Sequence, residues 1–147
     1  MNESIQLIAA FTGSAGFAMA YNFRGAKAVL TAGLGGCAGW LCYLLVLHFT
    51  GSSYLAGYAG TVLVSIYSEL AARFLRAPAT GFLIVTSIPM IPGASLYRCM
   101  QHLLLSETAL FRREGIETIL FASCMAAGFI TSAVCVHLLG SLRKDNS

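Results

Sequence analysis

Long apolar segments separated by short polar turns constrain this chain more than any other feature of its sequence. They recur from one end to the other, and about 20 apolar residues in a helix cross the hydrocarbon core of a bilayer. Of the 147 residues, 57% are hydrophobic and 10% are charged, whereas a soluble domain carries about 25% charged residues. So few charges cannot cover a water-facing surface. The sequence therefore predicts an all-α integral membrane protein.

The polar turns predict about five transmembrane segments within one membrane domain, residues 1–147. The turn NFRGAK ends the first segment, TGSS ends the second, and a basic turn before Pro78 ends the third. The fourth segment is expected to be broken at Pro89 and at Pro92-Gly93. The expected segments are about 5–21, 28–49, 54–74, 80–105 and 115–139.

The basic residues of the short loops predict an orientation, because lysine and arginine are enriched on the cytoplasmic side. If residues 80–105 span the membrane, Arg112 and Arg113 lie on one side. The other side then holds six basic residues: Arg24, Lys27, Arg73, Arg76, Arg143 and Lys144. This puts the N-terminus outside and the C-terminus in the cytoplasm. If residues 80–105 re-enter instead, the tail lies outside with a similar distribution of charge, and both topologies stay open.

A strip of glycines in the second segment predicts close helix packing. Gly33, Gly36 and Gly39 recur every three residues, and small residues let the backbones of membrane helices approach closely. The neighbouring helix belongs either to this chain or to another subunit. Because five segments of this length leave little interior, a fully lined site is expected to need a second copy, as in a homo-oligomer, or a partner.

The stretch SIPMIPGASLYRCMQ, residues 87–101, breaks the fourth segment. Pro89 and Pro92 lack the N–H that would bond the carbonyl four residues earlier, which for Pro92 is that of Ile88. Gly93 tolerates the backbone angles that a break requires. Unpaired backbone groups are costly in hydrocarbon, so the break is expected to face protein, water or a ligand. The half-helix that follows begins near the midplane with free N–H groups, which carry partial positive charge.

That half-helix carries polar residues on one face, among them Ser95, Arg98 and Gln101. Many secondary transporters hold anionic substrate groups at such interrupted helices. We therefore expect a small carboxylate-bearing substrate to bind a set of residues around the break: Pro92, Gly93, Ser95, Tyr97, Arg98 and Gln101. The alternative is a plain proline kink in which Arg98 reaches the membrane interface.

Glu69 and Arg73 form a second polar feature, four residues apart in the orientation that favours a helical ion pair. Ionisable groups in membrane segments are candidates for function. Two interpretations stay open: Glu69 takes part in proton coupling, or the two residues form an ion pair at the interface.

Enzymatic chemistry has little support in the sequence. There is no GxSxG, because GASLY places Tyr97 where the second glycine should stand, and there is no HExxH or P-loop. The five cysteines are odd in number and lack CxxC spacing, so we expect no metal site and no cofactor. The nine basic residues are scattered, which argues against nucleic acid.

Several motifs together resemble one family. They are the E-x-x-x-R of Glu69 and Arg73, the APAT of residues 77–80 and the PGxxxYR of residues 92–98. Over residues 5–140 the chain resembles the threonine/serine exporter (ThrE) family, in particular its second membrane half and its small YjjB-like subunits. It departs from the family at Ala94-Ser95, where members often have more glycine.

The resemblance implies a subunit of a secondary-active exporter in a bacterial cell inner membrane. Its substrates would be small amino acids of the threonine or serine type, or dicarboxylates such as succinate, and its partner a larger membrane subunit of the same family. The alternative is a membrane assembly or stabilising subunit that does not itself contact substrate. The broken helix and Arg98 favour the exporter, because a scaffold has no reason to keep a break and a charge at the midplane.

Overall fold

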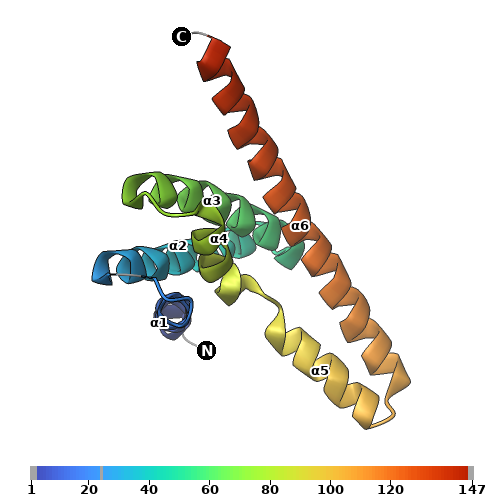
Figure 1. Cartoon of the computed structure of the whole chain (residues 1–147). Coiled ribbons are helices and arrows are strands. Elements are labelled where there is room, and N and C mark those ends of the chain that lie inside the picture. Colours follow the sequence, from blue (N-terminus) through green and yellow to red (C-terminus); the bar gives the residue numbers. More distant parts are fainter. Residues whose placement is uncertain (1–2, 24, 146–147) are drawn as a thin grey trace.

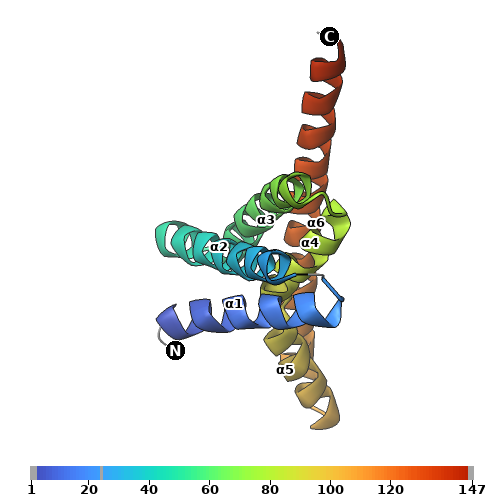
Figure 2. The ribbon, with the colours of Figure 1, turned by 60° about the vertical axis from the view of Figure 1, so that its left-hand side comes forward.

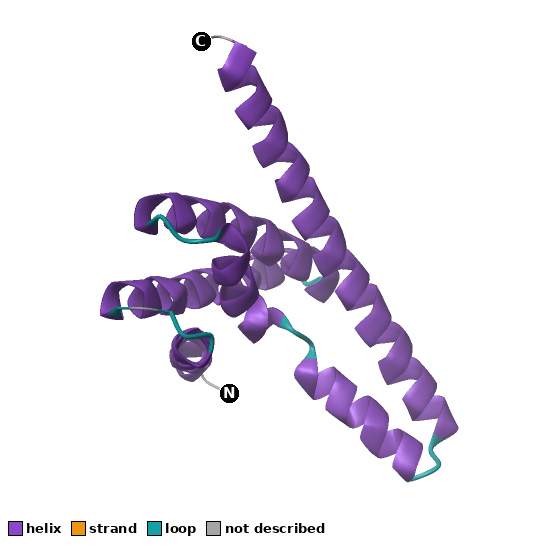
Figure 3. Ribbon diagram, viewed as in Figure 1, coloured by secondary structure: helices purple, strands orange, loops and turns teal. Residues whose placement is uncertain are grey.

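The computed structural model describes residues 3–23 and 25–145, and the described chain is helical without strands (Figures 1 and 3). Each of the five expected segments holds a helix, and the fourth holds two. Arg24, which entered the prediction of orientation, lies outside the described residues. The helices are α1 Glu3–Ala20, α2 Ala26–Thr50, α3 Ser53–Leu75, α4 Ala79–Ser87, the 3-10 turn η1 Ile88–Met90, α5 Gly93–Leu104 and α6 Thr108–Asp145.

Three single helices in the described chain are long and apolar enough to cross a membrane. They are α2, α3 and residues Thr108–Val136 of α6. A fourth span results if Ala79–Met90 and Gly93–Leu104, which are bent by 56° at the break, form one broken segment instead of a re-entrant loop. The structure therefore supports three or four spans, and the count of five stays a prediction.

Helices α1 to α4 pack as one group with small residues at their contacts. An added Cβ at Gly33 would lie 2.8 Å from the ring of Phe11 on α1, and one at Gly36 would overlap the side chain of Ser14. At Gly39 it would overlap Val64 on α3. The glycine strip is thus occupied by helices of this chain, and α2 lies between α1 and α3.

Helix α5 and the N-terminal part of α6 form a hairpin that projects away from the other four helices (Figures 1 and 2). Among the described elements α5 packs on α6 alone, whereas α6 also packs along α3. The approach of α6 to α3 is close, since an added Cβ at Gly128 would lie 2.9 Å from the carbonyl oxygen of Tyr58.

Helix α6 begins at Thr108, before the expected start at residue 115. The charged residues Arg112, Arg113 and Glu114 were expected in a loop, and this boundary was wrong. Arg113 and Glu117 form an i, i+4 ion pair of 3.2 Å, which supports a helix. The charged residues therefore lie on the hairpin, where they can contribute to a site.

Candidate functional site

The backbone at the break changes direction over two residues. Ile91 is extended, with φ −61° and ψ 129°, and Pro92 has φ −75° and ψ 56°. The carbonyl of Ile88 accepts a hydrogen bond from the N–H of Ile91 at 3.2 Å. We expected Pro92 to leave this carbonyl free, but the 3-10 turn of η1 satisfies it.

Gly93 does not carry the backbone change that we expected of it. It is the first residue of α5, its φ lies outside the left-handed region, and open space surrounds the position of a Cβ. Its N–H donates to the carbonyl of Ile91 at 2.7 Å, whereas the N–H groups of Ala94 and Ser95 have no backbone partner in the described chain. Two amides of the α5 N-terminus are therefore free to bind an anion.

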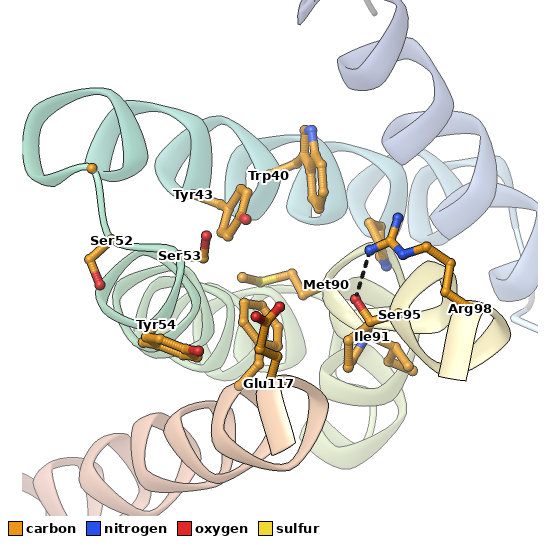
Figure 4. Close-up of a pocket in the computed structure, with 14 residues that line it drawn as sticks. Trp40, Tyr43, Ser52, Ser53, Tyr54, Met90, Ile91, Ser95, Arg98 and Glu117 are labelled. Carbon is orange, nitrogen blue, oxygen red and sulfur yellow. Dashed lines mark hydrogen bonds between the residues drawn. The ribbon is translucent and has the colours of Figure 1, made fainter. Parts of the chain in front are cut away.

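A pocket of about 580 Å³, here called the Arg98 pocket, lies beside the break (Figure 4). Its volume is within the range of about 300–1,000 Å³ that is usual for small-molecule sites. Helices α2, α3, α5 and α6 all contribute to its walls. The lining residues are Trp40, Tyr43, Gly51, Ser52, Ser53, Tyr54, Pro89, Met90, Ile91, Pro92, Ser95, Arg98, Glu117 and Phe121.

Three of the six predicted substrate-binding residues line this pocket: Pro92, Ser95 and Arg98. Gly93 is next to it but does not line it. Tyr97, which is 71% exposed, and Gln101 lie one turn apart on a different face of α5, away from the pocket. The structure thus brings together half of the predicted set.

Arg98 is held between the two arms of the hairpin. One terminal nitrogen donates to Ser95 Oγ at 3.3 Å, and Nε donates to Glu114 Oε2 on α6 at 3.4 Å. The side chain is 53% exposed, and an exposed ion pair of this kind contributes at most about 1 kcal/mol. A guanidinium has five N–H donors. Arg98 is therefore positioned at the pocket with donors left for a ligand.

Glu117 is the residue at this site that sequence reasoning missed. It lines the Arg98 pocket from α6, and Figure 4 shows its carboxylate directed into it. Ser53 and Tyr54 also line the pocket from the start of α3, where the TGSS turn had marked only a boundary. The helical spacing of Glu117 and Phe121 was the available signal, because it places both on one face of a helix that begins early.

The predicted Glu69–Arg73 ion pair is present, at 3.2 Å. Its carboxylate is 33% exposed and lines a second cavity of about 330 Å³, here called the Glu69 groove. Beneath the groove, Ser68 Oγ lies 3.0 Å from Thr86 Oγ1. The groove is lined by Ser65, Ser68, Glu69, Ala79, Thr80, Leu83, Phe129, Ser132, Ala133 and Val136.

Comparison with known proteins identifies one family. The family described as "Threonine/Serine exporter, ThrE" matches residues 6–135. No solved structure matches the chain. The matched range contains both motifs: Ala79 and Thr80 of APAT line the Glu69 groove, and Pro92, Ser95 and Arg98 of PGxxxYR line the Arg98 pocket. This confirms the resemblance, and the chain therefore belongs to the threonine/serine exporter (ThrE) family, a family of membrane transporters and not of enzymes.

Proposed function

We propose that this chain is a subunit of a secondary-active exporter and that it binds the carboxylate of a small substrate in the Arg98 pocket. The observation that carries the proposal is the position of the Arg98 guanidinium, which lines a pocket at the N-terminus of an interrupted helix. The substrates are amino acids of the threonine or serine type, or dicarboxylates such as succinate.

Two sources of positive charge lie at the pocket, together with the carboxylate of Glu117. Arg98 supplies N–H donors in a planar fork that matches a carboxylate. The unpaired N–H groups of Ala94 and Ser95 supply the partial positive charge of a helix N-terminus. Because the bonds from Arg98 to Ser95 and Glu114 are long and exposed, an incoming carboxylate replaces them at little cost.

The subunit works with a larger partner of the same family or with a second copy. In the described chain α5 packs against α6 alone. The other faces of α5 are therefore left for a partner subunit, which would complete the walls of the Arg98 pocket. The protein lies in a bacterial inner membrane as a multi-pass protein, with the N-terminus outside and the C-terminus in the cytoplasm. The distribution of lysine and arginine among its loops supports this orientation.

Glu69 couples export to an ion gradient by exchanging a proton. Its carboxylate is partly buried and opens into a groove lined by four hydroxyl-bearing residues, and ionisable groups within membrane segments are commonly proton relays. The alternative is a subunit that only stabilises its partner, and in that case the Arg98 pocket never contacts substrate.

An export assay with Arg98→Lys tests the substrate-binding role. Lysine keeps the charge but cannot bind a carboxylate bidentately, so we expect vesicles with assembled variant complexes to lose most threonine export. Arg112→Lys is the matched control, because Arg112 is exposed on the same hairpin and does not line the pocket. Wild-type export by assembled Arg98→Lys and Arg98→Ala complexes would favour the stabilising subunit.

A further inference from the structure

The Arg98 pocket and the Glu69 groove lie one after the other along the same three elements. Helix α3 contributes Tyr54 to the pocket, and it contributes Ser65, Ser68 and Glu69 to the groove. The α4–η1 segment contributes Thr80 to the groove and Met90 to the pocket. Helix α6 contributes to both as well. The two cavities therefore follow one another along the same helices, although they share no lining residue.

One stripe of α6 runs from the pocket to the groove. Glu117 and Phe121 line the pocket, and Phe129 and Ala133 line the groove. Met125 stands between them, so that the five residues follow one another every four positions along α6, on a line that winds slowly around the helix. From the first to the last they cover about 24 Å at 1.5 Å per residue, most of the roughly 30 Å hydrocarbon thickness of a bilayer.

A small apolar plug separates the two cavities: Val64, Met90 and Met125, which are 0%, 2% and 7% exposed. Phe121 packs against the plug from the pocket side, and Leu83 and Phe129 pack against it from the groove side. Two of the three members of the plug are methionines, whose unbranched side chains adapt readily to new packing.

The position of Met90 couples the plug to the break. Met90 is the last residue of η1, directly before the two residues at which the backbone turns. Its side chain fits against Gly60 on α3, where an added Cβ would overlap the methionine methyl group. Movement of α5 about the break therefore acts on the residue that closes the path between the cavities.

The groove carries several polar side chains within a mostly apolar lining. Glu69 supplies a carboxylate, and Ser65, Ser68, Thr80 and Ser132 supply hydroxyls. Ser65 Oγ is buried and makes no hydrogen bond in the described chain, which costs free energy unless a ligand or water satisfies it. A carboxylate beside several hydroxyls complements an ammonium group, whereas the Arg98 pocket holds, besides the carboxylate of Glu117, a guanidinium that complements a carboxylate.

We propose that the Glu69 groove is a second binding site on the substrate path, open to the opposite side of the membrane from the Arg98 pocket. It holds the ammonium-bearing end of a small amino acid, and the plug of Val64, Met90 and Met125 is the gate between the two sites. This proposal rests on the proposed function, because the Arg98 pocket is the other end of the path.

Cysteine accessibility in the assembled complex tests the proposal. The native cysteines are replaced by serine or alanine, and single cysteines are introduced as Ser53→Cys in the pocket and Ser132→Cys in the groove. A charged, membrane-impermeant thiol reagent is then applied to intact cells and to inverted vesicles. Ser123→Cys is the matched control on α6, because Ser123 is exposed there and lines neither cavity.

We expect the reagent to label Ser53→Cys from one side of the membrane and Ser132→Cys from the other, and to label Ser123→Cys from neither. Met90→Ala is expected to open the plug, so that Ser132→Cys is also labelled from the pocket side, whereas Met90→Leu keeps the volume and the block. Labelling of both cavity cysteines from the same side, or no labelling of Ser132→Cys, would overturn the proposal.

Protection by ligands separates this proposal from the proposed function. Excess threonine is expected to slow the labelling of both cysteines, while succinate, which has no ammonium group, protects Ser53→Cys at most. Glu69→Gln should abolish threonine protection of Ser132→Cys and leave that of Ser53→Cys. If threonine protects Ser53→Cys and not Ser132→Cys, the groove is no substrate site although the proposed function stands. If threonine protects neither, both fail.

Discussion

Replacing Gly36 by alanine inserts a methyl group where α1 and α2 touch. The new Cβ would overlap Ser14 Oγ and lie 2.8 Å from Ser14 Cβ and 3.3 Å from the carbonyl oxygen of Ala10. Ser14 is fully buried, so its side chain has no open space to enter. The two helices must therefore separate, and overpacking of this kind costs about 1–3 kcal/mol.

The helical preference of alanine over glycine opposes that cost by about 1 kcal/mol, so a single variant does not isolate the packing. Gly16→Ala is the matched control, because Gly16 is inside α1 with nothing within 4 Å of an added Cβ. Gly16→Ala therefore gains the helical preference of alanine without a steric overlap. The unfolding free energy of Gly36→Ala should therefore fall about 1–3 kcal/mol below that of Gly16→Ala.

Thermal unfolding of the two purified variants in the same detergent measures this difference. Gly36→Leu, which adds a larger side chain, is expected to insert in the membrane but to lose the packing of α1 on α2 and the assembled complex with it. Equal melting temperatures for Gly36→Ala and Gly16→Ala would refute the reasoning, as would normal assembly of Gly36→Leu.

Three further predictions concern the break and the groove. Pro92→Ala should let the helix run on and remove the free amides, so that the variant assembles but binds labelled threonine poorly; unchanged binding would show that the break is only a kink. Glu69→Gln should abolish gradient-driven export in vesicles, since an amide takes up no proton at physiological pH, whereas normal export would exclude a coupling role. Ser68→Ala should remove the buried hydrogen bond with Thr86 and lower stability by about 1 kcal/mol in thermal unfolding relative to Ser123→Ala, and equal stability would contradict this.

The helices and the break could be predicted from the sequence because both depend on residues that are close together along the chain. Apolar length fixes the membrane segments, and Pro89 and Pro92 interrupt a helix wherever they stand within it. The start of α6 was missed because the charges of residues 112–114 were interpreted as a loop. On the hairpin these charges pair with Glu117 and with Arg98, which a local reading does not show.

The candidate site was predicted in part for a related reason. Arg98 and Ser95 lie on α5 itself, so helical spacing placed them together. Tyr97 was included although its position on the helix directs it to another face. Glu117 and Ser53 come from distant parts of the chain, and only the packing of α6 against α3 brings them to the pocket. Helical spacing places Glu117 and Phe121 on one face of α6, but it does not show that this face meets the start of α3.

The stripe of α6, Glu117 to Ala133, also shows what the sequence alone does not predict. Its repeat of four positions from Glu117 to Ala133 is present in the sequence, and each successive pair in it predicts a shared helix face. Which helix this face meets, and that a plug at Met125 divides the facing space into two cavities, follow only from the arrangement of α3 and α4.

Equilibrium binding of labelled threonine to the purified, assembled complex tests the central claim most directly. Wild type, Arg98→Ala, Arg98→Lys and the control Arg112→Ala are compared, with unlabelled serine and succinate as competitors. The account predicts that the control binds like wild type and that both Arg98 variants lose most of their affinity, Arg98→Lys included. Wild-type affinity in an assembled Arg98→Ala complex would contradict it, because the guanidinium would then not hold the substrate.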